Sequence, residues 1–203
     1  MTIIALTLIA YLFGAVPFGL FVARLNGVDI RAHGSGNIGA TNVFRVVGKG
    51  WGILTFTLDA LKGFLPAFAF PIAGAVHPDW GVLFGVTAIM GHTFPVYLKF
   101  KGGKGVATSA GMLAGVAPLA VGAGFVSWLI TVLISRYVSL ASIVAALVVG
   151  ISVWLDPAGK SMLIKSALSL MALLVIWLHR ANIKRLCNGT ENRFGKKKEG
   201  HSS

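Results

Sequence analysis

Long apolar runs are the feature that most constrains how this chain can fold. Six of them cover most of its 203 residues, at about 3–23, 51–74, 80–98, 106–134, 137–155 and 161–179. A helix needs roughly 20 apolar residues to cross the hydrocarbon core of a bilayer. Only 12% of the residues are charged, whereas soluble domains average about 25%. The sequence therefore predicts an all-α integral membrane protein.

Basic residues divide the predicted loops into two kinds. They follow the first and the third apolar runs, and seven more follow the last run, whereas residues 75–79 contain no Lys or Arg. The positive-inside rule assigns the basic segments to the cytoplasm. The N-terminus is then outside and the C-terminus cytoplasmic, which requires an odd number of spans.

Dividing the long run 106–134 into two helices makes the number of spans odd. Pro118 lies near its middle, and proline removes a helical hydrogen bond and clashes with the preceding turn. We expect two helices, at about 105–117 and 119–134, with the last outer turn at 156–159. This division gives seven transmembrane helices. Five spans would result if 106–155 divides differently.

The remaining composition limits the domain organisation and the partners. Residues 1–188 are expected to form one membrane domain, and 189–203 a basic cytoplasmic tail that is disordered or lies on the membrane surface. The net charge of +12 fits anionic lipid headgroups, and no nucleic-acid-binding module is present. Cys187 is the single cysteine, so neither an intrachain disulfide nor a cysteine metal cluster is expected. We expect no metal and no cofactor.

Three polar segments stand out on the predicted cytoplasmic side. The first is 33–42, which is rich in Gly, Ser, Thr and Asn and is followed by Arg45. Thr41, Asn42 and Arg45 are spaced so that they can share one face of a helix. The segment predicts a ligand site, although a turn followed by an interfacial helix would explain it too.

The second segment, 99–108, alternates lysines with glycines. Glycines let backbone N–H groups converge on one point and lysines add charge there, a combination that suits an anion such as phosphate. It is not a Walker A loop, because Lys104 is followed by Gly105 rather than by Ser or Thr. A flexible basic loop is the alternative.

The third segment, 177–186, ends the last apolar run. His179 and Asn182 are three residues apart and face the same way on a helix. An interfacial anchor is the alternative here. Within the spans, Asp59 and Lys62 can form an ion pair, for which we expect a structural role.

Together these segments, the third continued by Gly189 and Glu191, resemble the three motifs of the bacterial acyl-phosphate-dependent glycerol-3-phosphate acyltransferases. The resemblance covers about residues 10–192, and Gly91–Pro95 and Asp59–Gly63 also resemble family patterns. It implies a seven-helix enzyme of the bacterial cytoplasmic (inner) membrane, with its active site on the cytoplasmic face. Such an enzyme moves the acyl group of an acyl phosphate to the 1-hydroxyl of glycerol 3-phosphate, releasing lysophosphatidic acid and phosphate. No metal, acyl-CoA, acyl carrier protein or obligate protein partner is implied.

The resemblance also implies roles for individual residues. The implied catalytic residues are Ser35, Lys104 and His179. Those implied to bind glycerol 3-phosphate are Arg45, Lys104, Ser142, His179 and Asn182. Those implied to bind acyl phosphate are Ser35, Gly36, Asn37, Thr41, Gly102 and Gly103. Either His179 or a substrate phosphate oxygen would take the hydroxyl proton.

A transporter or channel for an organic phosphate is the alternative function. A basic face with a glycine loop could bind anions for transport as well. However, transporter sites lie near the membrane midplane between inverted repeats. Here the polar residues gather at one face, and no inverted repeat is visible.

Overall fold

The computed structural model describes residues 1–155 and 160–194, which form helices, turns and loops without a strand. The α-helices are α1 (Thr2–Gly14), α2 (Phe18–Leu25), α3 (Ala40–Val46), α4 (Lys49–Ala73), α5 (Trp80–Thr93), α6 (Val106–Val116), α7 (Pro118–Ser135), α8 (Val138–Ser152), α9 (Met162–Leu178) and α10 (Arg180–Cys187). Two short 3₁₀ helices are η1 (Ile30–Ala32) and η2 (Val96–Leu98). The predicted all-α class is confirmed for these residues, and the predicted turn at 156–159 lies outside them.

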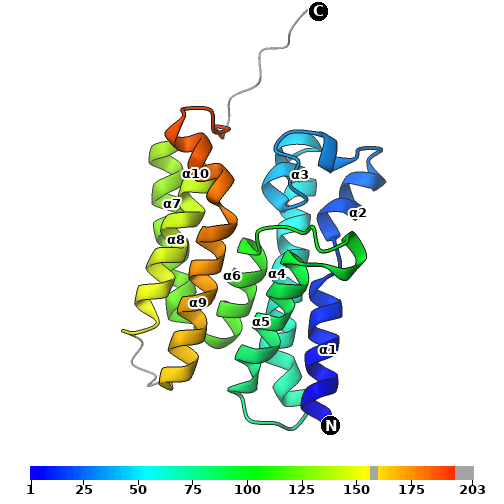
Figure 1. Ribbon diagram of the computed structural model, residues 1–203, viewed down its shortest axis with the longest axis vertical. Helices are drawn as coiled ribbons and strands as arrows, with labels where there is room; N and C mark the ends of the chain where they lie inside the picture. The colour runs from blue at the N-terminus through cyan, green and yellow to red at the C-terminus, as the bar shows by residue number, and fades with distance from the viewer. Residues whose placement is uncertain (156–159, 195–203) are drawn as a thin grey trace, which may run out of the picture.

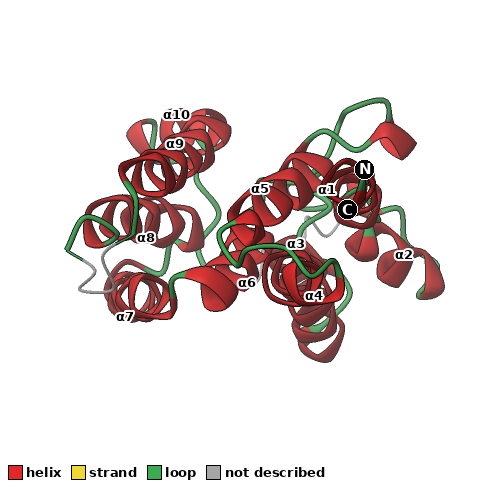
Figure 2. Ribbon diagram, turned by 90° about the horizontal axis from the view of Figure 1, so that it is seen from below, coloured by secondary structure: helices red, strands yellow, loops and turns green. Residues whose placement is uncertain are grey.

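The helices form two groups that lie side by side (Figure 1). Helices α1–α6 make one group and α7–α10 the other, and the view from below shows α6 near the boundary between them (Figure 2). Within the groups, α4 packs against α6 and α3, α1 against α5, and α8 against α7 and α9. The contacts between the groups come mainly from α6 with α7 and from α5 with α9.

Four helical segments in the described part of the chain are long and apolar enough to cross a membrane: residues 2–25, 49–73, 80–98 and 118–135. A fifth results if α9 and α10, which meet at a bend of 51°, are counted as one span. Helices α6 and α8 are apolar but shorter. The structure thus supports a membrane protein with four or five such spans by length and composition.

Prolines set two of the helix breaks. The predicted division of the run 106–134 is confirmed, because α6 ends at Val116 and α7 begins at Pro118. A second break, between α1 and α2, was not predicted. There Pro17 lacks an N–H and disfavours a helical conformation at Val16, so the first apolar run bends after Gly14.

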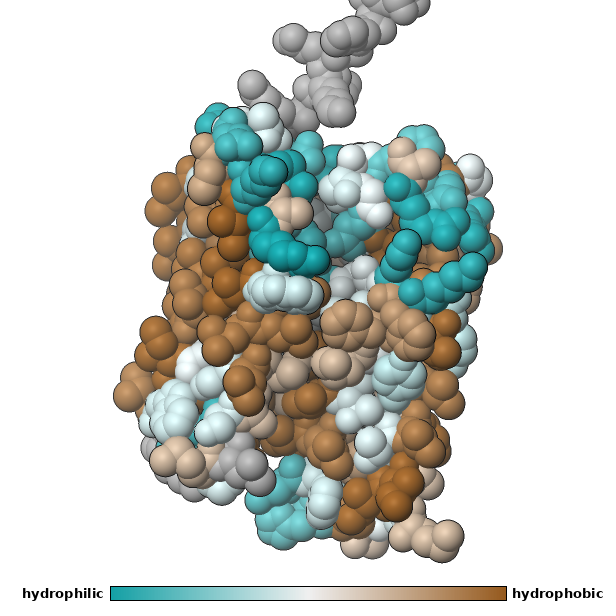
Figure 3. Space-filling model, viewed as in Figure 1, coloured by the Kyte–Doolittle hydropathy of each residue, from teal (hydrophilic) through white to brown (hydrophobic). Residues whose placement is uncertain are grey.

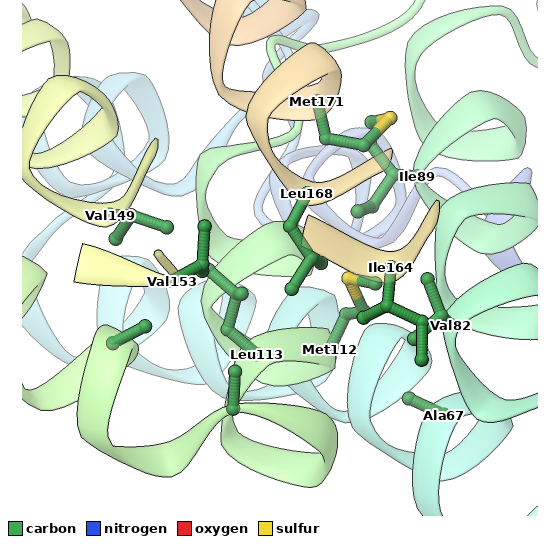
Figure 4. Packing of buried hydrophobic residues seen from close by; sticks show 12 residues of the cluster. Ala67, Val82, Ile89, Met112, Leu113, Val149, Val153, Ile164, Leu168 and Met171 are labelled. Atoms are coloured by element: carbon green, nitrogen blue, oxygen red, sulfur yellow. The ribbon is translucent and has the colours of Figure 1, made fainter. Parts of the chain in front are cut away.

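Side chains from both groups meet in one apolar core (Figure 4). Ile89 of α5, Met112 of α6 and Leu168 of α9 are almost fully buried there. Val149 of α8 and Val153, which directly follows α8, also belong to this core. Lipid surrounds such helices with equally apolar material, so close packing rather than escape from water holds them together. This core fixes the two groups to each other.

Hydrophilic residues gather at the end of the bundle that carries α2, α3 and α10, next to a broad apolar band (Figure 3). A second, smaller core of Leu20, Ile30, Ile38 and Val43 supports this end. It packs the polar segment 26–39 onto α2 and α3. The apolar members of this segment therefore anchor the loop whose polar members remain available for a ligand.

Glycines bring α4 and α6 into backbone contact. A Cβ atom at Gly111 would lie 1.9 Å from the carbonyl oxygen of Ala60, and one at Gly63 would lie 2.0 Å from that of Thr108. These distances are far too short for any side chain. The position of α6 beside α4 therefore depends on both glycines.

We expect Gly111→Ala to separate α4 from α6 and to lower the free energy of unfolding by about 1–3 kcal/mol, the usual effect of overpacking. Thermal unfolding of the purified protein in detergent measures the change. Gly122→Ala is the matched control, because a Cβ at that α7 position meets nothing within 4 Å. Equal Tm values for the two variants would contradict the role assigned to Gly111.

Candidate functional site

Asn42 organises the first polar segment. This residue of α3 is almost fully buried. Its Oδ1 accepts from the N–H of Ser35 at 3.0 Å, and its Nδ2 donates to the carbonyl oxygens of His33 and Asn37 at 3.0 and 2.9 Å. One side-chain amide thus closes the loop on itself. Gly34 permits this closure, since its φ is +62° and a Cβ there would lie 2.3 Å from the Asn42 Oδ1.

The glycine-lysine segment is anchored to the end of α5. The N–H of Gly102 donates to the carbonyl oxygen of Thr93, and that of Gly103 donates to the carbonyl oxygen of His92, both at 3.1 Å. These two N–H groups therefore serve the fold and do not converge on an anion. The segment instead presents Lys104, whose ammonium group donates to the Oδ1 of Asn182.

His179 lies between α9 and α10 and is almost fully buried. Its Nδ1 is 2.8 Å from the carbonyl oxygen of Val175. A carbonyl can only accept, so Nδ1 carries the proton of the neutral ring and Nε2 is left with a lone pair. His179 is thus prepared to accept a proton or a hydrogen bond.

Glu191 was not predicted as a site residue. Its carboxylate accepts from the side chains of Ser139, Asn182 and Arg185 at 2.9, 2.7 and 2.7 Å. Because the side-chain NH₂ group of Asn182 donates to Glu191, the side-chain oxygen of Asn182 is turned toward Lys104. The sequence held a signal for this role, because Glu191 continues the third motif of the family resemblance and is the first acidic residue after the third polar segment.

Residues 189–194, the first part of the predicted tail, contact the helices. The N–H of Phe194 donates to the carbonyl oxygen of Arg136 at 2.7 Å, and its ring contacts that of Phe44 with centroids 5.3 Å apart. The C-terminal segment therefore crosses from α10 to α3, which belongs to the other helix group. Residues 195–203 of the predicted tail lie outside the described residues.

These segments enclose a cavity of about 330 Å³ at the hydrophilic end. Eight of the predicted site residues line it: Ser35, Asn37, Thr41, Arg45, Lys104, Ser142, His179 and Asn182. The predicted residues Gly36, Gly102 and Gly103 are not among its lining residues. Asp59, His92 and Glu191 are further residues of the lining.

A second cavity of about 360 Å³ continues from the first. It is almost entirely apolar, and helices α5–α9 supply most of its walls. Four residues line both cavities: Phe56, Val106, Trp128 and Ser142. The site therefore joins a polar chamber to an apolar one, a shape that suits a ligand with a charged head and a hydrocarbon chain.

Burial tunes the charges in the polar cavity. It lowers the pKa of Lys104 from 10.5 to about 8, although the carboxylate of Glu191 opposes the shift. It also lowers the pKa of Arg45, again against the effect of Glu191. Burial would raise the pKa of Glu191, but hydrogen bonds from Asn182 and Arg185 outweigh it and lower that pKa. At neutral pH Lys104 and Arg45 are thus cations in the cavity, and the Glu191 carboxylate is an anion beside them.

The polar cavity holds no obvious metal site. Among the described residues, no three His, Cys, Asp or Glu side chains are grouped closely enough to hold a metal ion. The cations, amides and hydroxyls suit a phosphate ester instead.

Comparisons with known proteins agree on one family. Residues 4–189 match the family described as Glycerol-3-phosphate acyltransferase. The chain is 44% identical over 189 residues to the glycerol-3-phosphate acyltransferase of Geobacter sulfurreducens, covering 93% of this chain and 96% of that protein. It is also 44% identical over 190 residues to that of Aquifex aeolicus, covering 93% and 97%.

Two solved structures share the fold. One is PlsY (YgiH), described as an integral membrane glycerol 3-phosphate acyltransferase, in its glycerol 3-phosphate form, with a TM-score of 0.89 and 42% identity. The other is the lysophosphatidic acid form of PlsY, with a TM-score of 0.87 and 41% identity. Each comparison covers 96% of both chains.

We expect Glu191→Ala to lower the free energy of unfolding by about 1–3 kcal/mol, because it leaves buried donors on Asn182 and Ser139 without an acceptor. Thermal unfolding in detergent measures the loss. Thr190→Ala is the matched control, since Thr190 is exposed and its hydroxyl donates only a long hydrogen bond of 3.5 Å, to the carbonyl oxygen of Arg185. A wild-type Tm for Glu191→Ala would contradict this role.

Proposed function

The chain belongs to the glycerol-3-phosphate acyltransferase family, and from this membership we propose which substrates its two cavities bind. The enzyme transfers an acyl group to glycerol 3-phosphate and makes lysophosphatidic acid. We propose that the acyl donor is an acyl phosphate, so that inorganic phosphate is the second product. The observation that carries the proposal is the polar cavity, lined by residues of all three motifs and continuous with an apolar one.

Glycerol 3-phosphate binds in the polar cavity in this proposal. Arg45 and Lys104 pair with its phosphate, as cations do in charge-assisted hydrogen bonds. His179, Asn182 and Ser142 hold the glycerol part. The apolar cavity takes the acyl chain, because its lining offers almost no polar group.

The phosphate of the acyl donor binds to the first polar segment. Ser35, Asn37 and Thr41 offer hydrogen-bonding side chains at the cavity wall. Gly36, Gly102 and Gly103 act indirectly, by shaping the backbone of the segments whose other residues line the cavity. The carbonyl carbon then lies near the residues shared by the two cavities.

The reaction needs positioning more than activation. The 1-hydroxyl of glycerol 3-phosphate attacks the acyl carbon, a C–O bond forms, and the bond from that carbon to the phosphate oxygen breaks. Phosphate is a good leaving group from such a mixed anhydride, so held substrates and a nearby cation such as Lys104 can supply much of the acceleration. The hydroxyl proton passes to Nε2 of His179 or to a phosphate oxygen, which requires no carboxylate base.

The same proposal orients the chain in the membrane. The hydrophilic end carries the three basic segments, so it faces the cytoplasm by the positive-inside rule. Residues 2–25, α4, α5, α6, α7, α8 and α9 then make seven spans, with the short α6 and α8 tilted or in a thinned bilayer. Soluble glycerol 3-phosphate reaches the site from the cytoplasm of a bacterium, and the enzyme lies in its inner membrane.

Purified protein in detergent should release phosphate only when acyl phosphate and glycerol 3-phosphate are both present. Failure with both substrates in a folded sample would overturn the proposal.

Arg45→Ala should raise the KM for glycerol 3-phosphate by roughly 10- to 100-fold, because one charge-assisted contact with the phosphate is lost. Lys101→Ala is the control, because Lys101 is exposed and is not a cavity residue.

We expect kcat/KM for glycerol 3-phosphate to fall as the pH rises through about 8, because Lys104 loses its proton there. Below that pH the ammonium group is charged and can pair with the substrate phosphate. Lys104→Arg keeps the charge at all accessible pH values, so its profile should lack this fall. A wild-type kcat/KM that stays constant to pH 9.5 would contradict the role of Lys104.

A further inference from the structure

Two opposite charges are buried inside the helix bundle. Asp59 and Lys62 of α4 form an ion pair of 2.8 Å, as predicted, and their side chains are only 3% and 1% exposed. Lys62 also donates to the carbonyl oxygen of Val16 at 2.7 Å, in the break between α1 and α2. That contact gives the cation a structural role. The position of Asp59, the anion of the pair, needs a separate explanation.

The carboxylate of Asp59 faces His92 of α5. The Asp59 Oδ1, which pairs with Lys62, is also 3.7 Å from the His92 Nδ1, and that ring nitrogen has no hydrogen-bond partner within the part of the chain that the structure describes. Both residues line the polar cavity. The carboxylate of the ion pair therefore lies beside the imidazole ring at the wall of the cavity.

The other edge of the ring supports the glycine-lysine segment. A Cβ atom at Gly103 would lie 2.1 Å from the His92 Nε2, so the backbone at Gly103 rests directly against the ring. The N–H of Gly103 also donates to the carbonyl oxygen of His92. Lys104 is the next residue along the chain. The position of the His92 ring therefore fixes the position of the backbone directly before Lys104.

We propose that Asp59 and His92 are positioning residues for Lys104. The carboxylate orients the ring, the ring supports Gly103, and Gly103 aims the lysine at the phosphate of glycerol 3-phosphate. This inference rests on the proposed function, because it requires Lys104 to bind that phosphate. It assigns the buried charge of α4 a part in substrate binding besides its part in packing.

The test is a double-mutant cycle on the Kd of glycerol 3-phosphate, measured by calorimetry on the purified full-length protein. His92→Gln alone should raise this Kd by roughly tenfold, since a displaced Lys104 loses part of its charge-assisted contact with the phosphate. In the Lys104→Ala background the same change should raise it less than about twofold, because residues that act through one partner are not additive. Equal increases in both backgrounds, or no increase at all, would overturn the proposal.

A second variant tests the carboxylate itself. Asp59→Asn alone leaves Lys62 buried without its anion and can unfold the protein, so it is combined with Lys62→Met, which removes both charges. The folded double variant should show the same roughly tenfold rise in Kd as His92→Gln, and an unchanged Kd would overturn the role of Asp59. His92→Gln should also move the fall of kcat/KM with pH upward, toward the ordinary pKa of lysine. A loss of stability alone would leave that pH dependence unchanged.

The controls separate this proposal from the proposed function. Asp79→Asn makes the same substitution in the exposed loop between α4 and α5, and should leave the Kd unchanged. If the wild-type protein does not bind glycerol 3-phosphate, the proposed function itself fails. If it binds but His92→Gln has no effect through Lys104, only the positioning role fails.

Discussion

The hydrocarbon core of a membrane offers no hydrogen-bond partner, and the rest of this structure follows from that constraint. Each backbone N–H and C=O must be satisfied within the chain, so helices are the solution for a chain of long apolar runs. Where Pro17 interrupts a helix, the carbonyl oxygen of Val16 accepts from the ammonium group of Lys62 as well as from the N–H of Phe18. That ammonium in turn needs an anion, which Asp59 supplies. One helix break thus accounts for two buried charges on another helix.

Much of the architecture could be predicted because it depends on local chemistry. The lengths of the apolar runs predicted the helices, and Pro118 predicted the break that makes α6 and α7. Pro17 carried the same signal, but its apolar neighbours concealed it within one long run. The positions of most site residues followed from polar segments flanked by spans, because such segments meet at the hydrophilic end of the bundle.

The rest depended on pairings between residues distant in sequence. The glycines of the second motif suggested N–H groups that converge on an anion, but the amides of Gly102 and Gly103 bind carbonyl groups at the end of α5. Which carbonyl an amide finds is decided by tertiary packing rather than by spacing. Glu191 was missed for a related reason. The role of Glu191 depends on hydrogen bonds from Ser139, Asn182 and Arg185. These donors surround its carboxylate only after α8 and α10 have packed together.

The junction of the polar and apolar cavities has a kinetic consequence on the proposed function. Phe56, Val106, Trp128 and Ser142 line both chambers, so one substrate arrives from bulk water and the other by lateral diffusion in a leaflet. The rate then depends on the mole fraction of the donor among the surrounding lipids, and not on its bulk concentration. Adding inert lipid or detergent dilutes the donor in two dimensions and slows turnover, while the supply of glycerol 3-phosphate is unchanged.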